Sequence, residues 1–349
     1  MKVLPCLLVV FCTIASAVPS APHMHDAVSL AKTDPKVKQT PSFTNAELYN
    51  LTRHFFDQFI YPANLKQSAS VNSTLFSEDV LGRVDVTRTF VGRGKCGMTV
   101  RGRLTLTQHL TELNTEYFFG LFSTLATSKQ FSLLGVPVSY EISHFAAQQN
   151  IVSVAMIANF YLAALNITVP VEIDVWVSIF VRLASHKTNL SKATWNSLGQ
   201  MSQYDATFRY FQYTEEFLLG TAGQALGLNS TATIVYLSQA LAQSICGTAQ
   251  TYCTGANQIY NSTSECENFM LSIPFGLTYQ LGMNTLQCRM VHQPMVPFRP
   301  DVHCPHLSSR GGGYCTNDLT YEGVVLQPFF TNTPFVPKAF LTNATMASL

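Results

Sequence analysis

The sequence predicts an α+β fold, in which a curved antiparallel sheet packs on N-terminal helices and a helical, disulfide-stapled, cysteine-rich tail follows. Three observations in the 349-residue chain favour this class. An amphipathic helix signal begins near Thr44, four long runs rich in β-branched and aromatic residues lie between 138 and 213, and six cysteines fall between 246 and 315. Helices first, strands next and helices again are typical of α+β proteins.

The first residues predict export. A lysine at position 2, an apolar run from Val3 to Ile14 and the small-residue motif Ala15-Ser16-Ala17 indicate a signal peptide over 1–17. The apolar run is shorter than the ~20 residues that a membrane helix needs. Residues 18–41 contain four prolines, so they predict a linker. We therefore expect a secreted, extracellular protein that keeps no membrane span after signal cleavage.

Two helices are expected before the sheet. Thr44 and Glu47 have the spacing of a capping box, and Pro62 ends the first helix. A second helix is expected from Asn114 to Leu125. Helical spacing predicts that each buries one apolar face. The residues of these faces are Leu48, Leu51, Phe55 and Phe59 in the first helix, and Phe118, Leu121, Phe122 and Leu125 in the second.

Four consecutive antiparallel strands are expected next, because long apolar runs alternate with short polar breaks. They are Val138–Ala147, Val152–Leu165, Val169–Val181 and Met201–Tyr213. Helical periodicity then returns over Glu215–Leu226, Thr233–Cys246 and Glu265–Ser272, the last capped by Ser264. Residues 284–338 are rich in proline and lack a helical period, so they predict loop held by disulfides.

The cysteine count indicates three bridges and one extra thiol. Two of the nine cysteines leave with the signal peptide, and Cys96 stands alone. Six remain in the tail, and six cysteines allow 15 pairings. These six are Cys246, Cys253, Cys266, Cys288, Cys304 and Cys315.

Cys96 lies in a segment, 94–111, that lacks a core pattern and can be encoded with splice-donor and branch-point sequences. We hypothesise that 94–111 is translated intron, whose removal leaves an even number of cysteines. The alternative is a real surface loop with a free thiol. A weaker case of the same kind covers 181–195, and it would make the glycosylation sequon at Asn189 spurious.

Composition narrows the function classes. The net charge is +1 and only 12% of residues are charged, so no basic stripe points to nucleic acid. Asn-x-Ser/Thr sequons behind a signal peptide predict a glycoprotein. The expected sites are Asn50, Asn72, Asn166, Asn229, Asn261 and Asn343.

Two stretches carry a resemblance to known families. The motif over 75–85, repeated over 198–208, resembles the nuclear-transport-factor-2-like (NTF2-like) superfamily, which includes SnoaL-like domains; the likeness covers about 42–226. It implies an NTF2-like domain over 42–228 whose sheet forms a cone around an apolar pocket, as in small-molecule binders, lyases, isomerases and hydrolases. The tail, 229–349, resembles secreted fungal proteins at Cys246, Cys253 and Cys266 and over 284–292 and 299–306; this likeness covers nearly the whole mature chain and implies no activity.

An acid–base pair in the cone would need a histidine and a carboxylate. His144 is the first candidate, because alternation places it on one strand face with Tyr140. Asp174 and Asp205 lie on neighbouring predicted strands and could orient it or act as base. The alternative is a histidine bonded to backbone and two sheet-surface carboxylates. The other residues expected to reach a bound ligand are Tyr49, His54, Asp85, Tyr117, Tyr140 and Trp176.

The tail holds a second candidate site. His292, His303 and His306 lie around Cys288 and Cys304, and three imidazoles are enough for a zinc or copper ion with an open position. The alternative is three loop histidines that cap carbonyl groups. No carboxylate beyond Asp301 stands near in sequence to orient them. The main expectation is therefore no cofactor, with a metal at these histidines as the alternative.

The sequence contains no nucleophile elbow, phosphate loop, dinucleotide fingerprint or HExxH motif. Three functions remain. The first is a secreted protein that binds a small apolar molecule in the cone. The second is a cofactor-free lyase or isomerase with a His–Asp pair, and the third is a structural or interaction protein of the cell surface.

Overall fold

A computed structural model describes residues 43–70, 73–84, 90–91, 96–100, 103–107, 115–116, 118–127, 132, 135–148, 150–180 and 199–325. The predicted signal peptide and linker, the suspected insertion at 181–195, Asn72, Asp85, Tyr117 and Asn343 lie outside the described residues.

Helix α1 (Asn45–Phe59) begins at the predicted capping box. The Thr44 hydroxyl accepts from the Glu47 amide at 3.2 Å, and the Glu47 carboxylate accepts from the Thr44 amide at 2.8 Å. These reciprocal bonds satisfy amides that the first helical turn leaves unpaired. Helix α2 (Ala63–Ser70) follows directly after Pro62 and is missing from the sequence prediction.

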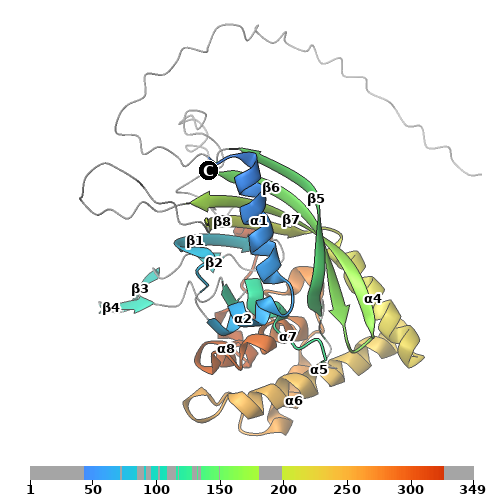
Figure 1. Ribbon diagram of the computed structural model, residues 1–349. Helices are drawn as coiled ribbons and strands as arrows, with labels where there is room; N and C mark the ends of the chain where they lie inside the picture. Colours follow the sequence, from blue (N-terminus) through green and yellow to red (C-terminus); the bar gives the residue numbers. More distant parts are fainter. Residues whose placement is uncertain are drawn as a thin grey trace, which may run out of the picture. The chain divides into compact units, whose positions relative to one another are not determined.

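A six-stranded sheet follows, with strand order β2-β1-β8-β7-β6-β5 (Figure 1). All neighbours are antiparallel except β1 and β8, which are parallel. The two similar sequence motifs therefore lie side by side in the sheet. The strands are β1 (Phe76–Val84), β2 (Phe90–Val91), β5 (Val136–Gln148), β6 (Ile151–Leu162), β7 (Ile167–Phe180) and β8 (Gln200–Phe208).

The suspected insertion at 94–111 contains a hairpin of its own. Strands β3 (Cys96–Val100) and β4 (Arg103–Thr107) pair only with each other in the described part of the chain. The hairpin projects from the six-stranded sheet in Figure 1. Whether 94–111 is retained intron stays a prediction, as do the domain boundaries.

Aromatic side chains fill the space between α1 and the sheet. Phe55 of α1 packs edge-on against Phe118, with ring centroids 4.7 Å apart. Phe59 meets Phe160 of β6 at 6.2 Å. Edge-to-face pairs of this kind add to the stabilisation from apolar burial. The helix therefore packs directly on the sheet, as the predicted cone requires.

Residues 115–116 and 118–119 are helical and lead into the 3-10 turn η1 (Gly120–Phe122), so the second predicted helix is present in short form. Phe118 and Phe122 are buried as expected. Leu125 was expected to face inward and is instead 57% exposed. The helical turn has ended before Leu125, so helical spacing no longer fixes its direction.

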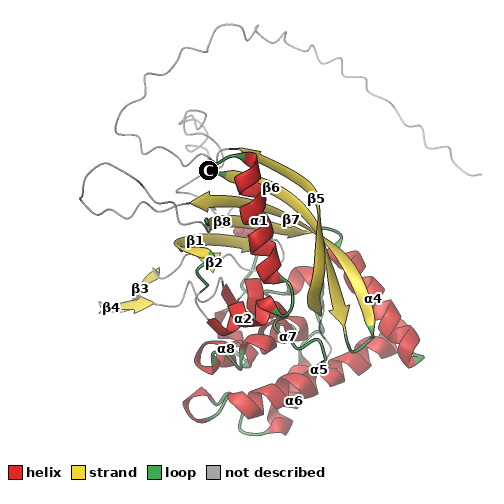
Figure 2. Cartoon of the chain, viewed as in Figure 1, coloured by secondary structure: helices red, strands yellow, loops and turns green. Residues whose placement is uncertain are grey.

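The C-terminal region is helical (Figure 2). Helix α6 begins at Ser262, whose hydroxyl accepts from the Glu265 amide at 3.1 Å, and not at the predicted cap Ser264. The prediction of loop over 284–338 is wrong as far as residue 325, because short helices occupy much of it. Pro300 is compatible with helix α8, because backbone N–H groups in the first turn of a helix have no acceptor within the helix and proline lacks only this group. The elements are α4 (Phe211–Leu226), α5 (Ser230–Tyr252), η2 (Gly255–Asn257), α6 (Thr263–Ser272), η3 (Thr278–Gln280), α7 (Leu286–His292), η4 (Gln293–Met295), α8 (Pro300–Leu307), η5 (Gly311–Gly313) and α9 (Tyr321–Val325).

Three disulfides staple these helices, as predicted. They join Cys246 to Cys266, Cys253 to Cys304, and Cys288 to Cys315. Stable disulfides are typical of oxidising compartments. Among the helices that the structure describes, none combines the length and apolar character needed to cross a membrane.

Candidate metal centre

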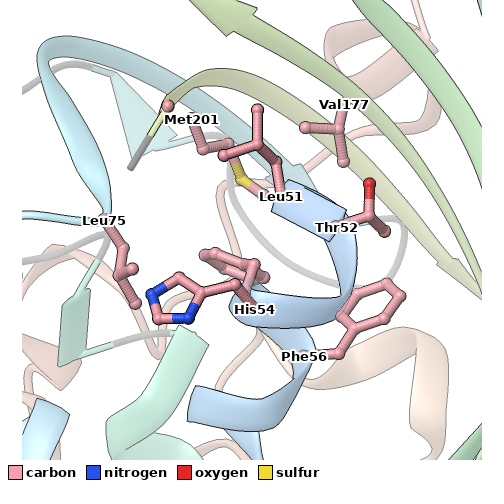
Figure 3. A pocket seen from close by; sticks show the side chains of 9 residues that line it. Leu51, Thr52, His54, Phe56, Leu75, Val177 and Met201 are labelled. Atoms are coloured by element: carbon pink, nitrogen blue, oxygen red, sulfur yellow. The ribbon is translucent and has the colours of Figure 1, made fainter. Parts of the chain in front are cut away.

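A small cavity lies between α1 and the sheet in the described part of the chain, where the ligand pocket was expected. A cavity lined by residues including Leu51, His54, Phe55, Val177 and Met201 has a volume of about 20 Å³ (Figure 3). A volume of about 10–15 Å³ holds one water molecule, whereas small-molecule pockets run to about 300–1,000 Å³. This cavity therefore has room for about one water molecule.

His144 does not share a strand face with Tyr140, contrary to the prediction. The β5–β6 register shifts between Ile142 and His144, as at a β-bulge. After the bulge Phe145 and Ala147 are the half-buried residues, and His144 is exposed. The extra residue reverses the alternation, which turns the His144 side chain to the outer face.

Both candidate carboxylates are held by arginines. Asp174 accepts from Arg209 Nε at 2.5 Å, and Asp205 accepts from Arg83 Nε at 2.8 Å. In the sheet register His144 lies opposite Ala155, which lies opposite Asp174. One complete strand separates His144 from Asp174, about 10 Å at the usual strand spacing. The structure therefore does not bring these three residues together as an acid–base site.

The other predicted ligand contacts do not converge either. Tyr49 packs edge-on against Phe145 at 5.1 Å. The Tyr140 hydroxyl donates to Asp57 Oδ1 at 2.7 Å, and burial followed by this bond raises the pKa of Tyr140 to about 12. Trp176 is 50% exposed on β7. Each residue has its own local surroundings on the helix or the sheet.

The three tail histidines do come together. His292 ends α7, and His303 and His306 lie one turn apart in α8. One ring nitrogen of each lies within 4.8 Å of the others. Their exposed fractions are 7%, 1% and 3%, respectively. Residues at i and i+3 share a helix face, which explains why His303 and His306 point the same way.

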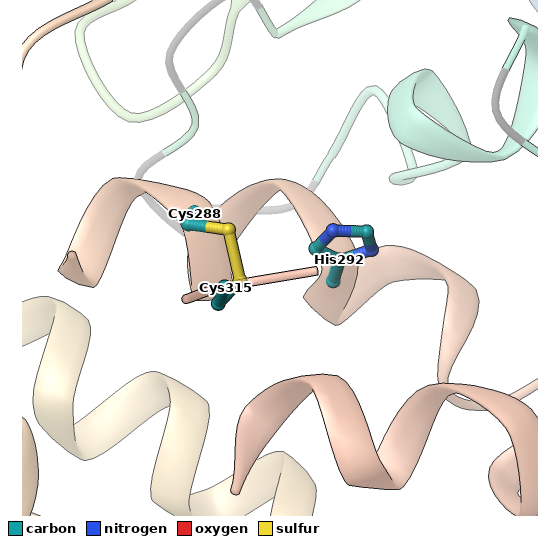
Figure 4. Close-up of side chains that lie close together, drawn as sticks. All are labelled: Cys288, His292 and Cys315. Carbon is teal, nitrogen blue, oxygen red and sulfur yellow. A yellow bond between two sulfur atoms is a disulfide. The ribbon is translucent and has the colours of Figure 1, made fainter. Parts of the chain in front are cut away.

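Disulfides fix the helices that carry these histidines. Cys304 lies between His303 and His306 and joins α8 to Cys253. The Cys288–Cys315 bridge lies beside His292, and Figure 4 shows the imidazole next to the two sulfur atoms. These covalent links hold both helices in place, which a binding site requires.

Burial favours the neutral form of two of these imidazoles, His292 and His306. Burial, with smaller contributions from His303 and Arg289, lowers the pKa of His292 to about 3. Burial and the two neighbouring histidines lower the pKa of His306 well below its usual value. Neutral imidazole is the form that binds metal ions. His292 Nδ1 is buried and has no hydrogen-bond partner in the described part of the chain.

A buried carboxylate completes the cluster. Glu116, 1% exposed, lies in the helical segment before η1 and places Oε2 2.9 Å from His303 Nε2. Its other oxygen lies 3.2 Å from Arg299 Nη1. Sequence reasoning missed Glu116 and considered Asp301, which is exposed. Glu116 lies on the helix expected over 114–125 but was not among the residues of its predicted buried face, so helical spacing gave no signal for it.

The distance between the Nδ1 atoms of His303 and His306 fits either a hydrogen bond or two ligands of one metal ion. His303 Nδ1 and His306 Nδ1 lie 3.3 Å apart, which suits a hydrogen bond if one of them is protonated. Zinc–nitrogen bonds of about 2.0–2.1 Å at tetrahedral angles also place two ligand nitrogens about 3.3–3.4 Å apart. The cluster has the donors for a three-histidine metal centre with a fourth position open.

Comparisons with known proteins identify the family. Residues 53–96 and 97–206 match the BfoA N-terminal domain, and residues 199–318 match the BfoA family C-terminal domain. The chain is 41% identical over 296 residues to bifonsecin B biosynthesis cluster protein A of Aspergillus brasiliensis, covering 84% of this chain and 87% of that protein. It is 41% identical over 295 residues to aurasperone B biosynthesis cluster protein A of Aspergillus niger, covering 84% and 85%. The relatives are fungal, as the tail motifs implied, and the chain belongs to the BfoA family.

Proposed function

We propose that this chain is an exported metalloprotein that serves a fungal biosynthesis cluster of the kind for which its relatives are named. His292, His303 and His306 bind one zinc or copper ion. The observation that carries this proposal is the approach of three buried imidazole nitrogens to within 4.8 Å of one another. Imidazole is a preferred ligand of both metals.

The buried location favours a metal that stabilises the fold. All three histidines are less than 9% exposed, so a bound ion is shielded from solvent. A substrate in solvent therefore cannot reach the fourth coordination position, which catalytic zinc sites keep accessible. The ion joins α7 to α8 and adds its binding free energy to the stability of the C-terminal helices.

Two features support export. Three buried disulfides fit an oxidising compartment. The four sequon asparagines within the described residues are all exposed, as glycan attachment requires. They are Asn50, Asn166, Asn229 and Asn261.

The two functions predicted for the cone have less support. A small apolar ligand would need more room than a cavity of about 20 Å³. A lyase or isomerase would need the histidine and a carboxylate within hydrogen-bond reach. An interaction role has one observation in its favour, because Tyr213 and Phe217 are 73% and 55% exposed on α4. Exposed aromatic side chains are typical of contact surfaces.

The test is metal analysis of the full chain, expressed in a eukaryotic secretory host so that the disulfides form. We expect one zinc or copper ion per chain, and we expect the His292→Gln and His306→Gln variants to lose it. His144→Gln is the matched control, since His144 is exposed on β5. A wild-type chain that stays metal-free after refolding and equilibration with buffered zinc and copper would refute the proposal.

A further inference from the structure

We infer that Glu116 is a positioning residue of the histidine centre and that it makes metal binding by the C-terminal domain depend on the N-terminal domain. The inference rests on the proposed metal site. All three histidines lie within 199–318, which matches the C-terminal family domain, whereas Glu116 lies within 97–206, which matches the N-terminal one. The Glu116 carboxylate of the N-terminal family domain therefore contacts His303 of the C-terminal one.

Glu116 lies next to one of the two ring nitrogens of His303 at ion-pair distance, without the angles of a hydrogen bond. Glu116 Oε2 lies 2.9 Å from Nε2, so this nitrogen faces the carboxylate. The other ring nitrogen, Nδ1, faces His306 Nδ1 at 3.3 Å. With the proton on Nε2, the Nδ1 lone pair points toward the centre of the cluster.

The carboxylate is itself held from several directions. Arg299 directly precedes α8, and its Nη1 lies 3.2 Å from the second carboxylate oxygen of Glu116, Oε1. On one side of Glu116, the Thr115 hydroxyl accepts from the Ser73 amide at 3.0 Å. On the other side, Ser123 Oγ donates to the Gly120 carbonyl at 2.6 Å and lies 3.4 Å from the Pro294 carbonyl of η4.

The segment that carries Glu116 and Gly120 also packs closely against η4. A Cβ added at Gly120 would lie 2.9 Å from Met295 Cγ. The backbone on both sides of Glu116 is therefore held in place, which keeps the carboxylate close to His303.

Carboxylates in this position have a known effect on metal ligands. They fix the tautomer of the histidine and raise its basicity, and their loss lowers metal affinity by about 10- to 100-fold. We expect the same loss for Glu116→Gln, whose side chain keeps the size of glutamate and loses the charge.

The experiment compares zinc affinity in the full chain by competition with a chromophoric chelator, together with the visible spectrum of the Co²⁺-loaded protein. Glu116→Gln should bind zinc about 10- to 100-fold more weakly and shift the Co²⁺ bands. Glu215→Gln is the matched control. Glu215 is also buried and accepts from the Thr278 amide at 3.1 Å and from Gln287, but it belongs to no part of the centre. It should lower stability and leave zinc affinity unchanged.

The outcomes separate the two proposals. If the wild type binds zinc and Glu116→Gln binds it equally well, the role of Glu116 is overturned and the metal site stands. The same conclusion follows if Glu116→Gln loses no more zinc affinity than Glu215→Gln does. If the wild type binds neither zinc nor cobalt, the metal site fails and this inference fails with it. Should Glu116→Gln not fold, Glu116→Asp keeps the charge beside Arg299 and withdraws the oxygen from His303. Unchanged affinity in that variant would also overturn the inference.

Discussion

The buried histidines predict that the metal-free protein loses stability in mild acid. The pKa of His292 is about 3 in the folded chain, and burial is the main cause. In the unfolded chain it returns to about 6.5. Between these two pH values the unfolded chain binds a proton that the folded chain does not. The stabilisation is therefore complete above about pH 6.5 and is lost as the pH falls.

The magnitude follows from the proton linkage. From pH 7.5 to pH 5.5, His292 alone lowers the free energy of unfolding by about 1.4 kcal/mol, since its folded pKa lies far below this range. The pKa of His306 is also lowered by burial, so His306 adds to the loss. Burial raises the pKa of Glu215, which gives an effect of the opposite sign. The comparison must therefore be made between variants and not between pH values alone.

The assay is guanidinium unfolding of the chelator-treated chain at pH 7.5 and pH 5.5, with the disulfides intact and circular dichroism as the signal. Between pH 7.5 and pH 5.5, the free energy of unfolding of the wild type should fall by about 1.4 kcal/mol more than that of His292→Gln. His144→Gln should behave as wild type, because that side chain is exposed. The reasoning is refuted if wild type and His292→Gln lose the same amount.

Three further predictions use other parts of the fold. Replacing Cys288 and Cys315 by serine should lower the free energy of unfolding by about 3.5 kcal/mol, from the entropy of a loop with sequence separation 27; an unchanged denaturation midpoint would contradict this. Gly82→Ala should destabilise the chain by about 1–3 kcal/mol in the same assay, because its Cβ would lie 2.2 Å from the Tyr204 ring. The control Gly220→Ala meets no atom within 4 Å in α4 and should stabilise by about 0.5–1 kcal/mol. Asn261→Gln should lower the mass of the secreted protein by one glycan, and an unchanged mass would exclude glycosylation there.

Local signals made most of the N-terminal fold predictable. The capping box at Thr44 and the long strand runs depend on neighbouring residues alone. The helices α7 and α8 were missed because seven or eight residues carry little periodicity, and Pro300 and Pro305 suggest loop. The position of His144 was missed because a β-bulge leaves no mark in a pattern of alternation.

The candidate centre was predictable only in part. Its three histidines stand close in the sequence, next to cysteines, so their type and spacing suggested a site. Glu116 and Arg299 meet there only through tertiary packing between two distant segments. A single sequence carries no signal for such a contact, and the part of the site that orients His303 therefore needed coordinates.

The three bridges of the described chain all lie between Cys246 and Cys315, and this placement makes assembly directional. Chains fold from the N-terminus as they are synthesised. The strands can therefore pair before any of these thiols has left the ribosome. At that stage the Glu116 carboxylate is still hydrated. It loses this hydration only when Arg299 and His303 have been synthesised and pack against it. Oxidation of the six cysteines then fixes the C-terminal helices around the completed polar cluster.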